Sequence, residues 1–134
     1  MVGVIIISHC KIAEELLKAA QLILGEIPSC IAIGIAPEEK LEKIAERLEQ
    51  ALAQVDEGEG AVILTDLFGG TPSNVSLSFL QEKKVEVVSG VNLPMVLKIG
   101  VGRHKKDLKE VVRIARDAGR KNISVASEIM KKRV

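Results

Sequence analysis

Aromatic side chains are almost absent from this sequence. Phe68 and Phe79 are the only rings among 134 residues, with no tryptophan and no tyrosine. Proteins that bind single-stranded nucleic acids or quaternary amines hold their ligands on aromatic rings, so the composition disfavours both classes. Nineteen basic and eighteen acidic residues leave a net charge of +1, so no strong positive field favours nucleic acid either. We expect no nucleic-acid partner.

Residues that ligate metals are also scarce. Cys10 and Cys30 are the only cysteines, and their spacing matches neither a zinc site nor a redox C-x-x-C pair. His9 and His104 are the only histidines that could join them. Two unpaired cysteines are typical of a protein from a reducing compartment. The sequence thus predicts no metal, no organic cofactor and a cytoplasmic location.

No apolar run approaches the roughly 18 residues that a membrane-spanning helix needs. The opening apolar stretch, residues 1–7, has no basic residue before it and no small-residue cleavage site after it, so it is not a signal peptide. We expect no direct insertion into a membrane. The apolar share of 47% and the charged share of 28% are ordinary for a globular protein. The length fits one domain over residues 1–134.

Short β-rich runs alternate with helical patterns along the chain. An uninterrupted apolar run, such as VGVIII at residues 2–7, is expected of a strand that is covered on both faces. Strands separated by helical segments require right-handed crossovers, which indicates an α/β fold with an open, mainly parallel sheet covered by helices. The predicted strands are Val2–Ile7, Cys30–Ile35, Ala61–Thr65, Val85–Val88 and a short last one, Ile123–Ala126.

Helical periodicity and terminal signals place the helices between these strands. The helix after the second strand should open at Pro37–Glu39, because proline and acidic residues are favoured in a first turn. Thr71 should cap the next helix, with Pro72 as its first residue, and Asn92 should start another. The predicted helices cover residues 11–24, 37–55, 72–81, 92–102 and 105–118.

The residues that follow the strands decide where a site would lie. Ligands of open parallel sheets bind beyond the carboxyl ends of the strands, where the winding direction reverses. His9 follows the first strand and Asp66 the third. If strand two lies outside strand one, and strands three and four run the other way, these two side chains face each other. A carboxylate that holds one ring nitrogen fixes the tautomer and leaves the other nitrogen free as a nucleophile.

The loop that follows Asp66 supplies the second half of this candidate site. Gly69 and Gly70 allow the backbone to approach a ligand closely. The N–H groups of a helix N-terminus, around Thr71 and Ser73, attract an anion and above all a phosphate. A nucleophilic histidine beside a phosphate-binding loop indicates phosphoryl transfer through a phosphohistidine.

Each of these features also has a plainer structural interpretation. His9 alone could be a hydrogen-bonded structural residue, and Asp66 alone could cap the turn that follows it. The Gly-Gly-Thr-Pro sequence alone is an ordinary start of a helix. No lysine follows the glycines, which excludes a Walker A loop. Only the combination of these residues points to a site.

The combination resembles the mannose-family enzyme IIA (EIIA) domain of the bacterial phosphoenolpyruvate-dependent sugar phosphotransferase system (PTS). The matching segments are VIIISH at residues 4–9, DLFGGTPSN at residues 66–74 and SGVNLPM at residues 89–95. The order of helices and strands agrees over essentially the whole chain. Cys10 stands where that family commonly has glycine, and Phe68 where it often has tryptophan.

The resemblance implies a phosphotransferase with a phosphohistidine intermediate. His9 would accept a phosphoryl group from phospho-HPr and pass it to a IIB component for carbohydrate uptake. Asp66 would orient His9, and the hydroxyl of Thr71 would contact the phosphate. The family fold implies the strand order 2-1-3-4 and a homodimer that exchanges a short antiparallel edge strand, for which Ile123–Ala126 is the candidate. We expect a separate IIB protein and association with the membrane components IIC and IID.

Two other functions stay open on the sequence. The first is a phosphoryl-donor subunit for dihydroxyacetone kinase, which would have a similar fold and a histidine at the same place. The DLFGGTPSN segment disfavours it, because a different loop is expected there after the aspartate. The second is a regulatory PTS binding module that is phosphorylated as a signal and serves no transporter.

Overall fold

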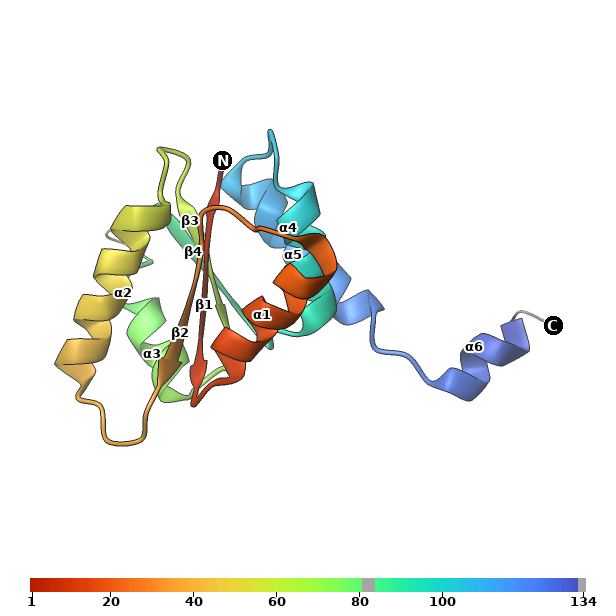
Figure 1. Cartoon of the computed structure of the whole chain (residues 1–134), viewed down its shortest axis with the longest axis horizontal. Helices are drawn as coiled ribbons and strands as arrows, with labels where there is room; N and C mark the ends of the chain where they lie inside the picture. Colours follow the sequence, from red (N-terminus) through yellow and green to blue (C-terminus); the bar gives the residue numbers. More distant parts are fainter. Residues whose placement is uncertain (81–83, 133–134) are drawn as a thin grey trace.

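A four-stranded parallel sheet forms the centre of the computed structural model, which describes residues 1–80 and 84–132. Its order is β2-β1-β3-β4 (Figure 1). This confirms the predicted α/β class and the predicted strand order. The strands are β1 (Gly3–His9), β2 (Cys30–Ile35), β3 (Ala61–Thr65) and β4 (Val85–Ser89).

The two central strands are buried, as their uninterrupted apolar sequences predict. Every residue of β3 is buried, and so is β1 up to its last residue, His9. In the β1–β3 register Ile7 lies opposite Thr65. Since parallel neighbours end at the same edge of a sheet, this register brings the residues after both strands together.

Helices cover both faces of the sheet (Figure 1). Helices α2 (Leu41–Val55) and α3 (Thr71–Leu77) lie on one face. Helices α1 (Ile12–Leu24), α4 (Leu93–Gly102) and α5 (Leu108–Lys121) lie on the other. Within the described part of the chain, none of the helices is both long and apolar enough to cross a membrane.

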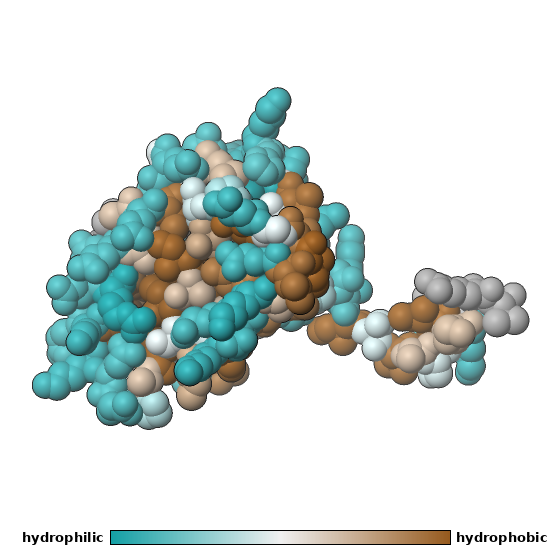
Figure 2. Space-filling model, in the orientation of Figure 1, coloured by the Kyte–Doolittle hydropathy of each residue, from teal (hydrophilic) through white to brown (hydrophobic). Residues whose placement is uncertain are grey.

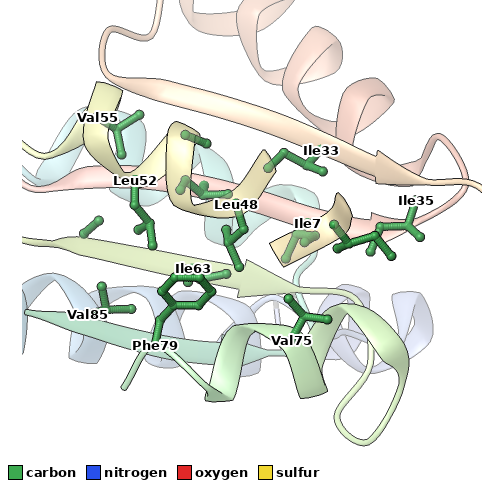
Figure 3. Close-up of a cluster of buried hydrophobic side chains, with 14 residues drawn as sticks. Ile7, Ile33, Ile35, Leu48, Leu52, Val55, Ile63, Val75, Phe79 and Val85 are labelled. Carbon is green, nitrogen blue, oxygen red and sulfur yellow. The ribbon is translucent and has the colours of Figure 1, made fainter. Parts of the chain in front are cut away.

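Alternate side chains of β1 enter the two hydrophobic layers, because successive residues of a strand point to opposite faces. Ile5 and Ile7 pack with α2 and α3, whereas Val4 and Ile6 pack with α1, α4 and α5. Figure 3 shows the first of these clusters, in which side chains from α2, α3 and the sheet meet. This two-sided core holds β1 rigidly and so fixes the position of the histidine at its end.

Helix α2 begins at Leu41 and not at Pro37–Glu39, so the predicted start is wrong. Glu39 closes the preceding loop instead: its carboxylate accepts the N–H of Ala36 at 3.1 Å and pairs with Arg47 at 2.8 Å. The backbone N–H, followed by the Arg47 guanidinium, holds the pKa of Glu39 below its ordinary value.

Helix α3 also begins one position away from its predicted start. Gly70 occupies the N-cap position in an extended conformation, and Thr71 is the first helical residue, so Thr71 is not the cap. The helix ends at Leu77, and the predicted end at Gln81 lies outside the described residues.

Side-chain caps define the starts of α4 and α5. Asn92 starts α4 as predicted, because its Oδ1 accepts the N–H of Met95 at 3.1 Å. Helix α5 begins at Leu108 rather than at residue 105, after a reciprocal capping box between Asp107 and Glu110.

The predicted strand over Ile123–Ala126 is wrong for this structure. Residues 123–125 have no regular structure, and Ala126 begins a helix, α6 (Ala126–Lys132), which lies apart from the rest of the molecule (Figure 1). A strand needs a paired neighbour, and this segment pairs with none of the four described strands. Its apolar side chains are exposed on a largely hydrophobic surface (Figure 2): Ile123, Val125, Ile129 and Met130.

A buried arginine joins the segments that precede β1 and β2. Arg103, next to the end of α4, is 1% exposed and donates to the carbonyl oxygens of Val2 (2.9 Å), Ser29 (3.2 Å) and Pro28. Burial lowers the pKa of its guanidinium.

Burial also raises the pKa of the Cys30 thiol to about 11. Cys30 is therefore protonated at neutral pH, and a protonated thiol is a poor nucleophile.

Candidate active site

The structure brings His9 and Asp66 together at the carboxyl edge of the sheet, as the strand order predicts. The ring nitrogen Nδ1 of His9 lies 2.8 Å from Oδ2 of Asp66. The same oxygen accepts the backbone N–H of His9 at 3.0 Å. Because an ionised carboxylate only accepts hydrogen bonds, the neutral form of the ring carries its proton on Nδ1 and has its lone pair on Nε2.

The side chains of His9 and Asp66 differ sharply in their exposure to solvent. The His9 side chain is 47% exposed, whereas the Asp66 side chain is 12% exposed. The second carboxylate oxygen, Oδ1 of Asp66, is buried and has no hydrogen-bond partner among the described residues. The aspartate is thus a largely enclosed support for an imidazole that solvent can reach.

The glycine loop lies directly against this imidazole. A Cβ atom built on Gly70 would lie 2.7 Å from Cε1 and 3.2 Å from Nε2 of His9, closer than carbon and nitrogen atoms normally approach. Gly70 is therefore required for its size. Gly69 serves a different purpose, because its φ of +94° favours glycine while no atom lies within 4 Å of its Cβ position.

The two hydroxyl residues of the loop occupy different environments. Thr71 is exposed and lines the same cavity as His9. Ser73 is fully buried, and its Oγ has no hydrogen-bond partner in the part of the chain that the structure describes. Of the six residues that the sequence singles out, the structure therefore brings four together, with Asp66, Gly70 and Thr71 around the imidazole of His9.

A cavity of about 450 Å³ opens beside His9. Besides His9, Cys10 and Thr71, its wall is formed by residues from the end of β2 to the first turn of α2, among them Ile35, Pro37 and Leu41. Sequence reasoning did not assign these residues to the site. The available signal was their position, since β2 also ends at this edge of the sheet and the loop to α2 begins there.

Exposed apolar side chains lie close to the site residues along the chain, and one of them, Leu41, lines the cavity. Leu67 and Phe68 follow Asp66 directly and are exposed, as are Ile12 at the start of α1 and Leu41 at the start of α2. Exposed apolar groups beside a reactive residue are typical of a surface that another protein covers.

Within residues 1–80 and 84–132, no group of three or more His, Cys, Asp or Glu side chains could hold a metal ion.

The fold and this geometry define a class of protein. It is an open α/β protein in which a largely enclosed carboxylate contacts a solvent-accessible histidine at the point where the sheet reverses its winding. The family model "PTS system fructose IIA component", EIIA-man, matches residues 3–116. The chain belongs to this family, and so it is a phosphotransferase component that carries phosphoryl groups in the sugar PTS.

Individual relatives agree with this assignment. The chain is 31% identical over 133 residues to the PTS system fructose-specific EIIA component of Bacillus subtilis, covering 98% of this chain and 91% of that protein. It is 32% identical over 124 residues to the mannose-specific EIIAB component of Escherichia coli K12. That match covers 91% of this chain and 38% of the longer protein.

Solved structures show the same fold. The EIIA component from Streptococcus agalactiae superposes with a TM-score of 0.87 at 25% identity, over 96% of this chain and 99% of that one. The mannose/sorbose-specific IIA subunit from Enterococcus faecalis gives a TM-score of 0.84 at 27% identity, over 92% and 93% of the two chains.

Proposed function

We propose that His9 is the residue of this chain that carries the phosphoryl group. It accepts the group from phospho-HPr and passes it to a IIB component for carbohydrate uptake. The observation that supports this most directly is the contact of 2.8 Å between Nδ1 of His9 and Oδ2 of Asp66, on an imidazole that is 47% exposed. This contact leaves Nε2 as the nucleophile.

The transfer step follows from that tautomer. The lone pair of Nε2 forms a bond to phosphorus while the bond between phosphorus and its donor atom on HPr breaks, and the electron pair of that bond stays on the donor atom. The proton on Nδ1 remains in place. The ring gains positive character, which the carboxylate of Asp66 stabilises. Transfer to IIB repeats the same exchange with the histidine as donor.

The glycine loop would hold the transferred group. Thr71 offers an exposed hydroxyl in the cavity of His9, and Gly70 brings the backbone against the ring. Ser73 would contribute its backbone N–H from the first turn of α3, because the first-turn N–H groups of a helix lack internal partners. Gly69 would form the turn that places these donors. Positioning and charge stabilisation supply most of the catalysis in such transfers.

The test of this proposal is a phosphorylation assay with phosphoenolpyruvate, enzyme I and HPr. The protein should acquire one acid-labile, alkali-stable phosphate per chain. His9→Ala should fold and acquire none, whereas His104→Ala, which removes an exposed histidine outside the site, should be labelled normally. Asp66→Ala should fold and react about a hundredfold more slowly or worse, because the ring loses its orienting group. Full labelling of His9→Ala would refute the proposal.

We further propose a cytoplasmic homodimer that works with the membrane components IIC and IID. In the described residues the outer edge of β4 pairs with no other strand. A cavity of about 410 Å³ lies along β4 and α5, and it includes Ile123. Open sheet edges and exposed apolar segments favour pairing with another chain. The exposed apolar segment from Ile123 to Met130 of a second copy would cover this edge.

Deleting residues 123–134 tests the dimer while it leaves α5 intact. We expect light scattering to find a monomer or an aggregate, and we expect Val125→Lys to weaken the dimer without shortening the chain. A truncated protein that stays a well-folded dimer would show that the C-terminal segment does not hold the two copies together.

A further inference from the structure

The hydroxyl of Ser8 joins the end of β1 to the start of α1. Ser8 immediately precedes His9 and is fully buried. Its Oγ donates to the carbonyl oxygen of His9 at 3.0 Å and accepts the N–H of Ala13 at 2.7 Å. Ala13 lies in the first turn of α1, and Lys11, the N-cap residue, makes no capping bond with its side chain. Ser8 therefore caps the helix in place of the usual residue.

Backbone N–H groups of His9 and Cys10 also hold the turn between β1 and α1, through bonds to Asp66 and to β2. The N–H of His9 donates to Asp66 after β3, and the N–H of Cys10 donates to the carbonyl of Ile35 in β2 at 2.8 Å. Cys10 has a φ of +49°, a conformation that residues with a side chain adopt reluctantly and keep only when their surroundings enforce it. The Ser8 hydroxyl is the contact that fixes this strained turn against α1.

We propose that Ser8 is a positioning residue for phosphoryl transfer. Its hydroxyl holds the main chain of His9 so that Nδ1 meets Asp66 and Nε2 faces the crevice. It acts through the backbone of His9 and does not touch the phosphoryl group. This inference rests on the proposed role of His9 as the phosphoryl acceptor.

The alternative is that Ser8 only stabilises the fold, as a buried cap of α1. The two roles predict different kinetics. A purely structural hydroxyl changes the free energy of unfolding and leaves kcat unchanged in the folded protein. A positioning hydroxyl changes kcat for transfer from phospho-HPr, because small displacements of a reacting atom slow a reaction strongly. It leaves KM nearly unchanged, because the exposed side chains around the crevice are intact.

The experiment compares Ser8→Ala with Ser76→Ala. Ser76 is also fully buried, and its Oγ donates one bond to the Pro72 carbonyl at 2.7 Å within α3. Transfer from phospho-HPr is measured on folded protein. For Ser8→Ala we expect kcat to fall about tenfold or more while KM changes by less than about twofold. For Ser76→Ala we expect kcat within about twofold of the parent, although the protein is destabilised.

A second measurement reads the geometry itself. Nuclear magnetic resonance of the His9 ring should show the Nδ1 proton protected by its bond to Asp66 in the parent and in Ser76→Ala, and exchanging faster in Ser8→Ala. Ser8→Cys serves if Ser8→Ala does not fold, because the thiol has nearly the same shape and is a much weaker hydrogen-bonding group. It should show the same loss of kcat and of Nδ1 protection.

Three results would overturn the inference: a folded Ser8 variant with the parent kcat, one slowed no more than Ser76→Ala, or a loss confined to KM. If the parent protein were phosphorylated elsewhere than on His9, the proposed function would fail instead, so the two failures are distinguishable.

Discussion

Replacing Gly70 with alanine should slow phosphoryl transfer without unfolding the protein. The new Cβ would lie 2.7 Å from Cε1 and 3.2 Å from Nε2 of His9. The backbone of Gly70 has φ −84° and ψ 174°, an extended conformation open to any residue. The conflict is therefore with the imidazole and not with the backbone.

The size of the effect follows from these distances. An ordinary van der Waals contact begins at 3.4 Å, whereas the new Cβ would lie 2.7 Å from Cε1. The ring must therefore move by about 0.7 Å from its position beside Asp66. A misplacement of about 1 Å can cost a hundredfold in rate. We expect transfer to slow by about 30- to 100-fold, which corresponds to about 2 to 3 kcal/mol in the activation free energy.

The assay measures transfer from phospho-HPr together with urea unfolding, on three glycine variants. Gly70→Ala should keep its free energy of unfolding within about 1 kcal/mol of the parent, because alanine also restricts the unfolded chain. Gly25→Ala should show the opposite pattern, with lower stability and the parent transfer rate. Gly25 has a φ of +87° and nothing within 4 Å of its Cβ position, so it should lose about 1 to 2 kcal/mol of stability at an unchanged rate. Gly102→Ala, also in open space with no positive φ, should keep the parent rate and lose no stability.

Transfer by Gly70→Ala at the parent rate would contradict this prediction. A rate that falls only in proportion to a loss of folded protein would contradict it equally, because the conflict with His9 would then have no kinetic consequence.

Three further predictions concern thiols, a buried cation and a cap. Iodoacetamide at pH 8 should alkylate the exposed Cys10, which shares a cavity with His9, and so slow phosphorylation. The Cys10→Ser variant should keep its phosphorylation rate under the same treatment. Cys30, with a pKa of about 11, should stay unmodified. Arg103→Met should leave buried carbonyl groups without their donor and cost about 3 kcal/mol of stability in urea unfolding. Asn92→Ala removes bonds to Met95 and Gly119 and should cost about 1 to 2 kcal/mol in the same assay.

Sequence patterns predicted the parts of this fold that depend on burial. The apolar runs of β1 and β3 are continuous because helices cover both faces of the sheet, so both strands could be predicted. The bounds of β3 match the prediction, whereas β1, predicted over Val2–Ile7, runs from Gly3 to His9. The strand order then placed His9 beside Asp66, since residues after adjacent parallel strands must meet. The candidate site follows from topology more than from any single motif.

The remaining features depend on contacts between distant segments. Nothing local shows that Glu39 closes a loop with Arg47 instead of opening a helix, because that choice depends on the packing of α2 against β2. The hydrogen bonds of Ser8 likewise appear only once β1 and α1 are placed. Residues 123–126 are apolar and β-rich in sequence, but a strand forms only where a partner strand is within reach.

The regiochemistry of the phosphorylated histidine tests the central claim most directly. Nitrogen-15-labelled protein would be phosphorylated with phosphoenolpyruvate, enzyme I and HPr, and its histidine ring nitrogens observed by nuclear magnetic resonance. We expect phosphorus coupling at Nε2 of His9, with a proton retained on Nδ1 by Asp66. Phosphate on Nδ1 of His9, on His104 or on Asp66 would contradict it.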